Sequence, residues 1–241
     1  MKTIIISQAR MTSSRLPGKV MMEVLDRPLL QYHVERLQKA KLADDVIVAT
    51  TINYTDDPIV DFCKKLNIKY YRGSEENVLS RYYEAAKLYK ADNVIRVTSD
   101  CPIIDPEIVD KTIQYYLDND YDYVSNCTIN RKYPRGMDTE IFSFNALSQA
   151  YKKAKKESEL EHVTTYMWKN PQIFKLGSVV NEVDESKHRW TVDTLDDFML
   201  IRLIIKNLYP INNEFNIQDC LELMRNNPDW MKINQDVVQK V

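Results

Sequence analysis

The chain has 241 residues, of which 44% are hydrophobic and 28% are charged, and its formal net charge is −2. This balance is typical of an ordinary globular protein and excludes long disordered regions. Because the total charge creates no broad positive field, binding to nucleic acid or to an anionic membrane would require a local basic patch.

Strand patterns alternate with helix patterns in the first half of the chain. Short β-branched runs predict strands at residues 3–6, 46–49 and 94–97, and apolar stripes predict helices at residues 28–40 and 78–89. Parallel strands joined by right-handed crossovers form a sheet with helices on both faces. We therefore expect an α/β fold, as a three-layer α/β/α sandwich whose mostly parallel sheet binds ligands at the carboxyl ends of its strands.

The second half is less regular. We expect a single domain over residues 1–241. The patterns there predict strands at residues 121–127, 138–142, 173–180 and 188–192, and helices at 143–155, 195–207 and 217–225.

A cluster of cations and hydroxyl groups directly follows the first predicted strand. Residues 9–19 read ARMTSSRLPGK, with three cations at Arg10, Arg15 and Lys19. Guanidinium forks and a compact ammonium suit phosphate oxygens, and hydroxyls and loop amides add further donors. The segment has neither the G-x-x-x-x-G-K-[ST] spacing of a P-loop nor the glycines of a dinucleotide fingerprint. It predicts another kind of polyphosphate clamp, with a solvated basic loop as the alternative.

An acid follows the third predicted strand. Asp100 stands in the segment VTSDCP at residues 97–102, at the same edge of the sheet as the basic loop. Magnesium prefers one or two carboxylates with phosphate oxygens and water, so a second acid is expected nearby. The segment WTVDTLDD at residues 190–197 is the best source. Its Asp196 and Asp197 stand in the first turn of a predicted helix, where capping and dipole stabilisation are the expected roles.

The cysteines and the N-terminal residues indicate in which cellular compartment the protein is expected. The first residues run straight into a strand without the pattern of a signal peptide, and no run approaches the ~18 apolar residues of a membrane-spanning helix. We expect a cytoplasmic protein with reduced thiols, because no C-x-x-C pair suggests a zinc site or a disulfide framework. The four cysteines are Cys63, Cys101, Cys127 and Cys220.

Three segments resemble one enzyme family. Residues 9–19 are similar to the opening signature A-R-x-x-S-x-R-[LF]-P-x-K of the cytidylyltransferases that activate acidic sugars, with the hydroxyl at Ser13 or Ser14. These are the acylneuraminate and 3-deoxy-manno-octulosonate cytidylyltransferases, and especially the SpsF-like branch of spore coat polysaccharide biosynthesis. RWTVDT at residues 189–194, and EHVT at 161–164 in a predicted helix, resemble later motifs. The resemblance implies a nucleotide-diphospho-sugar transferase fold, in which roughly residues 1–120 bind the nucleotide, while residues 121–241 bind the acceptor and offer a dimerisation surface.

The resemblance also implies roles for individual residues, each of which has a plainer structural alternative. Asn77 is otherwise a helix N-cap, and a lone histidine such as His162 is often structural. Asp138 and Glu140 share one face of a strand at period two, as on a solvated edge strand. The implied catalytic residues are Arg10, Arg15, Lys19 and Asp100; the nucleotide contacts are Ala9, Arg10, Ser14, Arg15, Lys19, Ser74, Asn77, Arg81 and Ser99; the metal ligands are Asp100 and Asp193; and the acceptor contacts are Arg135, Asp138, Glu140, His162 and Arg189.

The implied reaction is the transfer of CMP from CTP to a small acidic sugar, with Mg²⁺ or Mn²⁺ as cofactor and release of pyrophosphate. An acceptor hydroxyl attacks the α-phosphate in line, without a covalent enzyme intermediate. The expected partners are CTP, the acidic acceptor and a second copy of the chain, but neither nucleic acid nor a membrane. The alternatives are a nucleotidyltransferase for a sugar phosphate, a polyol phosphate or a phosphorylated amino-acid derivative, a glycosyltransferase of the same fold, and a non-catalytic nucleotide sensor.

Overall fold

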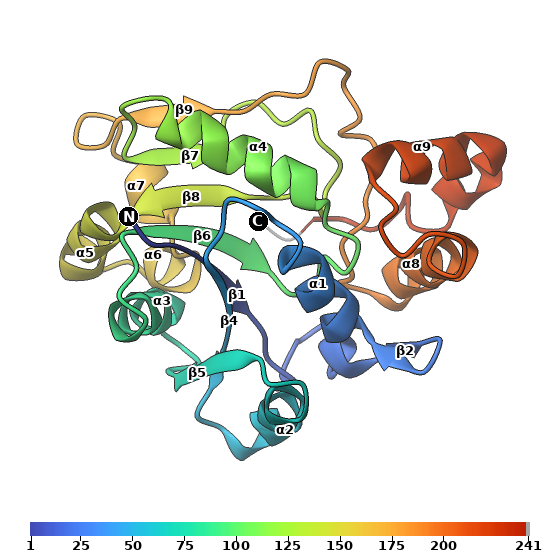
Figure 1. The fold of residues 1–241 in the computed structure, drawn as a ribbon, viewed down its shortest axis with the longest axis horizontal. Coiled ribbons are helices and arrows are strands. Elements are labelled where there is room, and N and C mark those ends of the chain that lie inside the picture. The colour runs from blue at the N-terminus through green and yellow to red at the C-terminus, as the bar shows by residue number, and fades with distance from the viewer. Residues whose placement is uncertain (240–241) are drawn as a thin grey trace.

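The computed structural model describes residues 1–239, and a seven-stranded sheet forms its middle layer (Figure 1). The strand order is β5-β4-β1-β6-β8-β7-β9; β8 runs antiparallel to both neighbours, whereas the other pairings in this sheet are parallel. A separate hairpin pairs β2 (Glu23–Val24) with β3 (Arg27–Pro28). The strands of the large sheet are β1 (Thr3–Gln8), β4 (Asp45–Thr51), β5 (Lys69–Gly73), β6 (Asn93–Thr98), β7 (Tyr123–Ser125), β8 (Glu140–Ser143) and β9 (Leu176–Ser178).

Helices cover both faces of this sheet. Alternate residues of a strand point to opposite faces. Ile5 belongs to the buried cluster that includes residues of α1, α2, α4, α8 and α9, whereas Ile4 and Ile6 belong to the cluster that includes residues of α3, α5 and α7 (Figure 1). The helices are α1 (Leu29–Leu37), α2 (Asp57–Lys65), α3 (Val78–Leu88), α4 (Pro106–Leu117), α5 (Phe144–Lys153), α6 (Glu157–Glu161), α7 (Thr165–Trp168), α8 (Leu195–Leu208) and α9 (Ile217–Asn226), with short 3-10 helices η1 (Lys19–Met21), η2 (Tyr54–Asp56) and η3 (Pro228–Lys232).

The predicted three-layer α/β/α sandwich with a mostly parallel sheet is confirmed. The predicted strands at residues 3–6, 46–49 and 94–97 lie within β1, β4 and β6. Because these three strands are adjacent and parallel, their carboxyl ends meet at one edge of the sheet. Among residues 1–239, no helix combines the length and the apolar character needed to cross a bilayer.

Two local predictions are wrong. Residues 188–192 form no strand but a single bridge between Arg135 and Arg189, because the chain there turns from that bridge directly toward α8. The bridge needs a glycine next to Arg135: a Cβ on Gly136 would lie 2.6 Å from the backbone carbonyl of Trp190. Residues 161–164 are not inside a helix either, since α6 ends at Glu161 and α7 begins only at Thr165.

Candidate functional site

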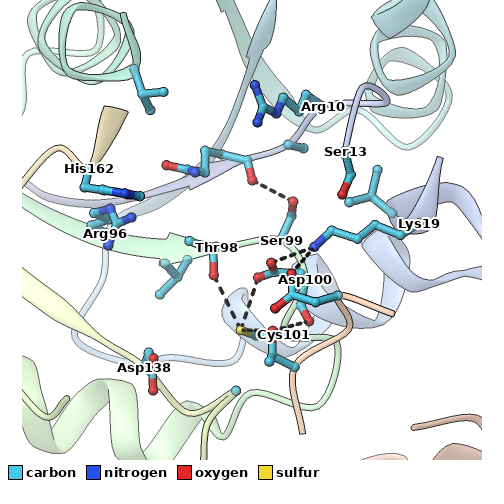
Figure 2. Close-up of a pocket in the computed structure, with 18 of the residues that line it drawn as sticks. Arg10, Ser13, Lys19, Arg96, Thr98, Ser99, Asp100, Cys101, Asp138 and His162 are labelled. Carbon is cyan, nitrogen blue, oxygen red and sulfur yellow. Dashed lines mark hydrogen bonds and ion pairs between the residues drawn. The ribbon is translucent and has the colours of Figure 1, made fainter. Parts of the chain in front are cut away.

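A pocket of about 400 Å³ opens where β1 and β6 end (Figure 2). Both halves of the chain line it. Of the residues predicted from the sequence, those in the lining are Ala9, Arg10, Ser14, Arg15, Lys19, Arg81, Ser99, Asp100, Arg135, Asp138, Glu140, His162 and Asp193, and those outside it are Ser74, Asn77 and Arg189.

The basic loop after β1 is closed on itself and tied to a neighbouring strand. The backbone N–H of Gly18 donates to the carbonyl of Met11 at 2.8 Å, with Gly18 at φ 72°, a left-handed conformation that glycine adopts without steric cost. The N–H of Met11 donates to Oδ1 of Asp56 at 2.7 Å, and the hydroxyl of Thr51 donates to the other oxygen of this buried carboxylate at 2.6 Å. The loop therefore presents its cations from a fixed backbone.

Lys19 brings the two distant aspartates together. Its ammonium donates to Oδ2 of Asp100 at 2.8 Å and to Oδ1 of Asp193 at 2.9 Å, and Arg15 lies 2.8 Å from that same Asp193 oxygen. Burial disfavours the charged ammonium, but the two carboxylates hold the pKa of Lys19 above its ordinary value. Burial likewise disfavours the carboxylate of Asp100, yet Lys19 holds the pKa of Asp100 well below its usual range. Lys19 and Asp100 are therefore both charged at neutral pH.

The donor set around this ammonium fits a divalent cation. Within residues 1–239, no cluster of three or more histidine, cysteine, aspartate or glutamate side chains is arranged to hold a metal ion. Magnesium, however, needs only one or two carboxylates when phosphate oxygens and water complete its shell. Among the described residues, Lys19 is the one cation that pairs with Asp100, through Oδ2, and Oδ1 of Asp100 accepts from the weak thiol of Cys101 at 3.5 Å. In contrast, both oxygens of Asp193 accept from cations. Asp100 is therefore the readier ligand.

Arg189 lies behind the pocket instead of in it. Its Nη2 lies 2.7 Å from Oδ2 of Asp193, and its Nε lies 2.9 Å from Oδ1 of Asp197. Asp197 is fully buried and, with Thr194, forms the capping box of α8, as its expected capping role requires. The arginine therefore supports Asp193 from the side away from Lys19.

The structure separates the predicted nucleotide contacts into two groups: residues that line the pocket and residues that cap a helix. Arg10 lines the pocket with a side chain that is 41% exposed and lies 3.6 Å from Glu75. Arg81 also lines the pocket, and its buried Nε has no partner among the described residues. In contrast, Oδ1 of Asn77 accepts from the N–H of Ser80 at 2.8 Å and caps α3. Ser74 in turn accepts from the N–H of Asn77 at 3.0 Å, so both side chains serve the helix start.

The four predicted acceptor contacts that reach the pocket come from the second half of the chain. Asp138 is held by Arg131, with Oδ2 2.8 Å from Nη2. Glu140 accepts hydrogen bonds from Arg96, Tyr123 and Thr164. Within residues 1–239, neither Arg135 nor His162 uses its side chain in a hydrogen bond or an ion pair. Figure 2 shows His162 across the pocket from Lys19. The structure therefore leaves the side chains of Arg135 and His162 available to bind an anion in the pocket.

Three residues at the site escaped the sequence reasoning. Arg96 lines the pocket from within the apolar strand β6, and an isolated charge in such a run is itself a signal of a buried ion pair. Arg131 holds Asp138 from a loop that carries no recognisable pattern. Gln239 lines the pocket from the far end of the chain, and no local feature of the sequence indicates this.

Comparison with known proteins gives a consistent result. The sequence pattern of the family described as cytidylyltransferase matches residues 4–214. The chain is 31% identical to the spore coat polysaccharide biosynthesis protein SpsF of Bacillus subtilis over 235 residues, which cover 94% of this chain and 95% of SpsF. It is 33% identical to the 3-deoxy-manno-octulosonate cytidylyltransferase of Geobacter metallireducens over 113 residues, 47% of this chain and 44% of that enzyme. The solved structure of a cytidylyltransferase from Leptospira borgpetersenii is 35% identical and superposes over the whole of both chains with a TM-score of 0.91.

Proposed function

The chain belongs to the cytidylyltransferase family of CTP-dependent nucleotidyltransferases, and from this premise we propose that it transfers CMP to a small acidic sugar with the help of a divalent metal ion. The observation that carries the proposal is the convergence of Arg15 and Lys19 on Asp100 and Asp193 at the carboxyl ends of β1 and β6. Cations from the loop and carboxylates from distant segments together suit a metal-bound triphosphate.

In the proposed reaction, Arg10, Arg15 and Lys19 bind the triphosphate and neutralise its charge. An acceptor hydroxyl attacks the α-phosphorus, forms a new P–O bond and releases its proton to water, while the bond to the β-phosphate oxygen breaks and pyrophosphate leaves. Such chemistry depends on positioning and charge stabilisation, and no covalent intermediate is needed. Asp100 and Asp193 would hold Mg²⁺ or Mn²⁺, which when bound neutralises and orients phosphate oxygens.

The acidic nature of the acceptor rests on two arguments. The partial match to a 3-deoxy-manno-octulosonate cytidylyltransferase links about half of the chain to an enzyme of acidic-sugar activation. The side chains of Arg135 and His162 line the pocket and make no ion pair within residues 1–239. An arginine fork binds a carboxylate or a phosphate with two parallel hydrogen bonds.

A pyrophosphate-release assay tests the proposal. Purified protein is incubated with CTP and Mg²⁺ and, in separate reactions, with nonulosonic and octulosonic acids, sugar phosphates, polyol phosphates and neutral sugars. We expect turnover with at least one of the acidic sugars, no turnover with the neutral ones, and loss of turnover in EDTA. A matched Asp100→Asn variant should be inactive, whereas turnover only with phosphorylated acceptors would reject the acidic-sugar assignment. Full turnover in EDTA would reject the role of the metal.

A further inference from the structure

The chain returns to the pocket after its last helix. Residues 233–239, which we call the C-terminal strap, follow η3 and run back toward the centre of the molecule (Figure 1). The family pattern ends at residue 214, so the strap lies outside the part of the chain that the pattern covers. Asn234 of the strap is only 6% exposed, and Gln239 lines the pocket.

The strap holds Arg189 at two points. The side-chain amide of Asn234 donates to the backbone carbonyl of Arg189 and to Oδ1 of Asp197, both at 2.9 Å. The side-chain carbonyl of Gln239 accepts from Nη1 of Arg189 at 2.6 Å. The strap thus fixes both the backbone of Arg189 and the outer edge of its guanidinium.

Arg189 transmits this constraint to Asp193. Its guanidinium is planar and rigid, and it uses Nη1 for the strap, Nε for Asp197 and Nη2 for Asp193. The backbone N–H groups of Asp193 and Thr194 donate to Oδ2 of Asp197, each at 3.0 Å. Both the side chain and the backbone of Asp193 are therefore oriented by a network that ends in the strap. Groups behind a ligand that orient it in this way commonly tune metal affinity.

We infer that the C-terminal strap is a positioning element of the active site: Asn234 and Gln239 hold Arg189, and Arg189 aims the Asp193 carboxylate for binding of the metal–CTP complex. The inference rests on the proposed role of Asp193 as a metal ligand. Without the strap, Arg189 keeps its bonds to Asp197 but loses the partner at Nη1, so its guanidinium no longer fixes Oδ2 of Asp193.

Calorimetric titration with CTP tests the inference without an acceptor, once in excess Mg²⁺ and once in EDTA. For Gln239→Ala and for Asn234→Ala we expect the affinity for CTP in Mg²⁺ to fall about 10-fold, and a chain that ends at Lys232 should lose at least as much. The affinity in EDTA should be unchanged, because the phosphate-binding loop is intact. Gln235→Ala, which removes an exposed amide from the same strap, is the matched control and should behave as wild type.

A conservative variant separates positioning from packing. Gln239→Glu keeps an acceptor for Nη1 of Arg189, so it should keep the wild-type ratio between the affinities in Mg²⁺ and in EDTA, even if its added charge weakens both. Wild-type affinity in Mg²⁺ for Gln239→Ala and Asn234→Ala would overturn the inference. So would an equal loss in Mg²⁺ and EDTA, since a purely structural role predicts that result. A wild-type protein that binds CTP equally with and without Mg²⁺ would instead reject the metal-binding role of Asp193, and the inference with it.

Discussion

The ammonium of Lys19 donates to Oδ2 of Asp100 at 2.8 Å, although the two residues are 81 positions apart in the chain. With Asp193 at 2.9 Å on its other side, this ammonium lies between two carboxylates that are candidates for holding a divalent ion. Lys19 and a metal ion therefore compete for the same negative charge until phosphate oxygens offer Lys19 another partner. That competition has a measurable consequence.

Replacing Lys19 by methionine should strengthen metal binding in the absence of CTP. At an effective dielectric constant of about 20, a unit charge about 4 Å away contributes about 4 kcal/mol, so its removal should raise the affinity for Mn²⁺ by at least about 10-fold. The same variant loses a phosphate contact, and pyrophosphate release should fall by about 100-fold. Titration with Mn²⁺ followed by electron paramagnetic resonance measures the first effect. Lys206→Met on the exposed face of α8 is the control, and equal Mn²⁺ affinity in all three proteins would contradict the prediction.

Arg135→Ala should affect the acceptor and leave the nucleotide alone. Hydrogen bonds to charged groups contribute about 1.5–3 kcal/mol, so the KM for an acidic acceptor should rise by about 10-fold to 100-fold. The KM for CTP should not change, because Arg135 is not part of the basic loop that would bind the triphosphate. Steady-state kinetics with each substrate varied in turn measure both constants. Lys132→Ala removes a nearby cation that does not line the pocket, and an equal rise in KM for that variant would count against a specific role of Arg135.

Much of the fold and part of the site could be predicted from short-range patterns. Buried parallel strands are apolar over their whole length, so the runs in β1, β4 and β6 stand out, and the residues that follow such strands necessarily meet at one edge. This is why the basic loop and Asp100 could be placed together. The resemblance to the cytidylyltransferases, which is confirmed, supplied Asp193.

The remaining features depend on contacts that no local pattern encodes. The apolar alternation at residues 188–192 resembles a strand, yet it buries Trp190 and Val192 in the same core cluster as residues of α8. Arg189 looks like an acceptor contact until the fold brings Asp197 and Gln239 to its guanidinium. Gln239 is 50 residues from Arg189 in the sequence, and only the three-dimensional path of the chain after α9 reveals their contact.

His33 should make the protein less stable in mild acid. Its ring is fully buried, 2.8 Å from the hydroxyl of Ser7 and 2.8 Å from the carbonyl of Cys101, and burial lowers the pKa of His33 to about 4. In the unfolded chain the ring of His33 therefore takes up a proton near pH 6.5, whereas in the folded chain it does so only near pH 4. Stability falls as the pH drops through that window, by up to about 3 kcal/mol.

Urea denaturation at several pH values between 7 and 4 measures this loss. His33→Gln removes the titrating ring, so its free energy of unfolding should change less with pH than that of the wild type, although the variant is less stable at pH 7. Burial also lowers the pKa of His188, which contributes in the same direction and remains in the variant. Parallel pH profiles for the two proteins would show that His33 does not control the effect.

Glu140 and Arg96 form a buried ion pair whose disruption should be costly. Glu140 is 4% exposed and accepts from Arg96, from the hydroxyl of Tyr123 at 2.5 Å and from that of Thr164 at 2.6 Å. Burial disfavours the carboxylate, but Arg96 and the two hydroxyls hold the pKa of Glu140 below its ordinary value. Glu140→Ala leaves a buried guanidinium without its counter-charge, which should lower the free energy of unfolding by about 3–5 kcal/mol.

The double variant Arg96→Met/Glu140→Leu distinguishes the loss of a pair from the loss of a partner. Because it removes both charges and refills the space with apolar groups, it should be more stable than Glu140→Ala alone. Urea denaturation of the two variants and the wild type gives the comparison. If the double variant were as unstable as Glu140→Ala, the cost would come from lost packing and lost hydrogen bonds to Tyr123 and Thr164 instead of from the unpaired charge of Arg96.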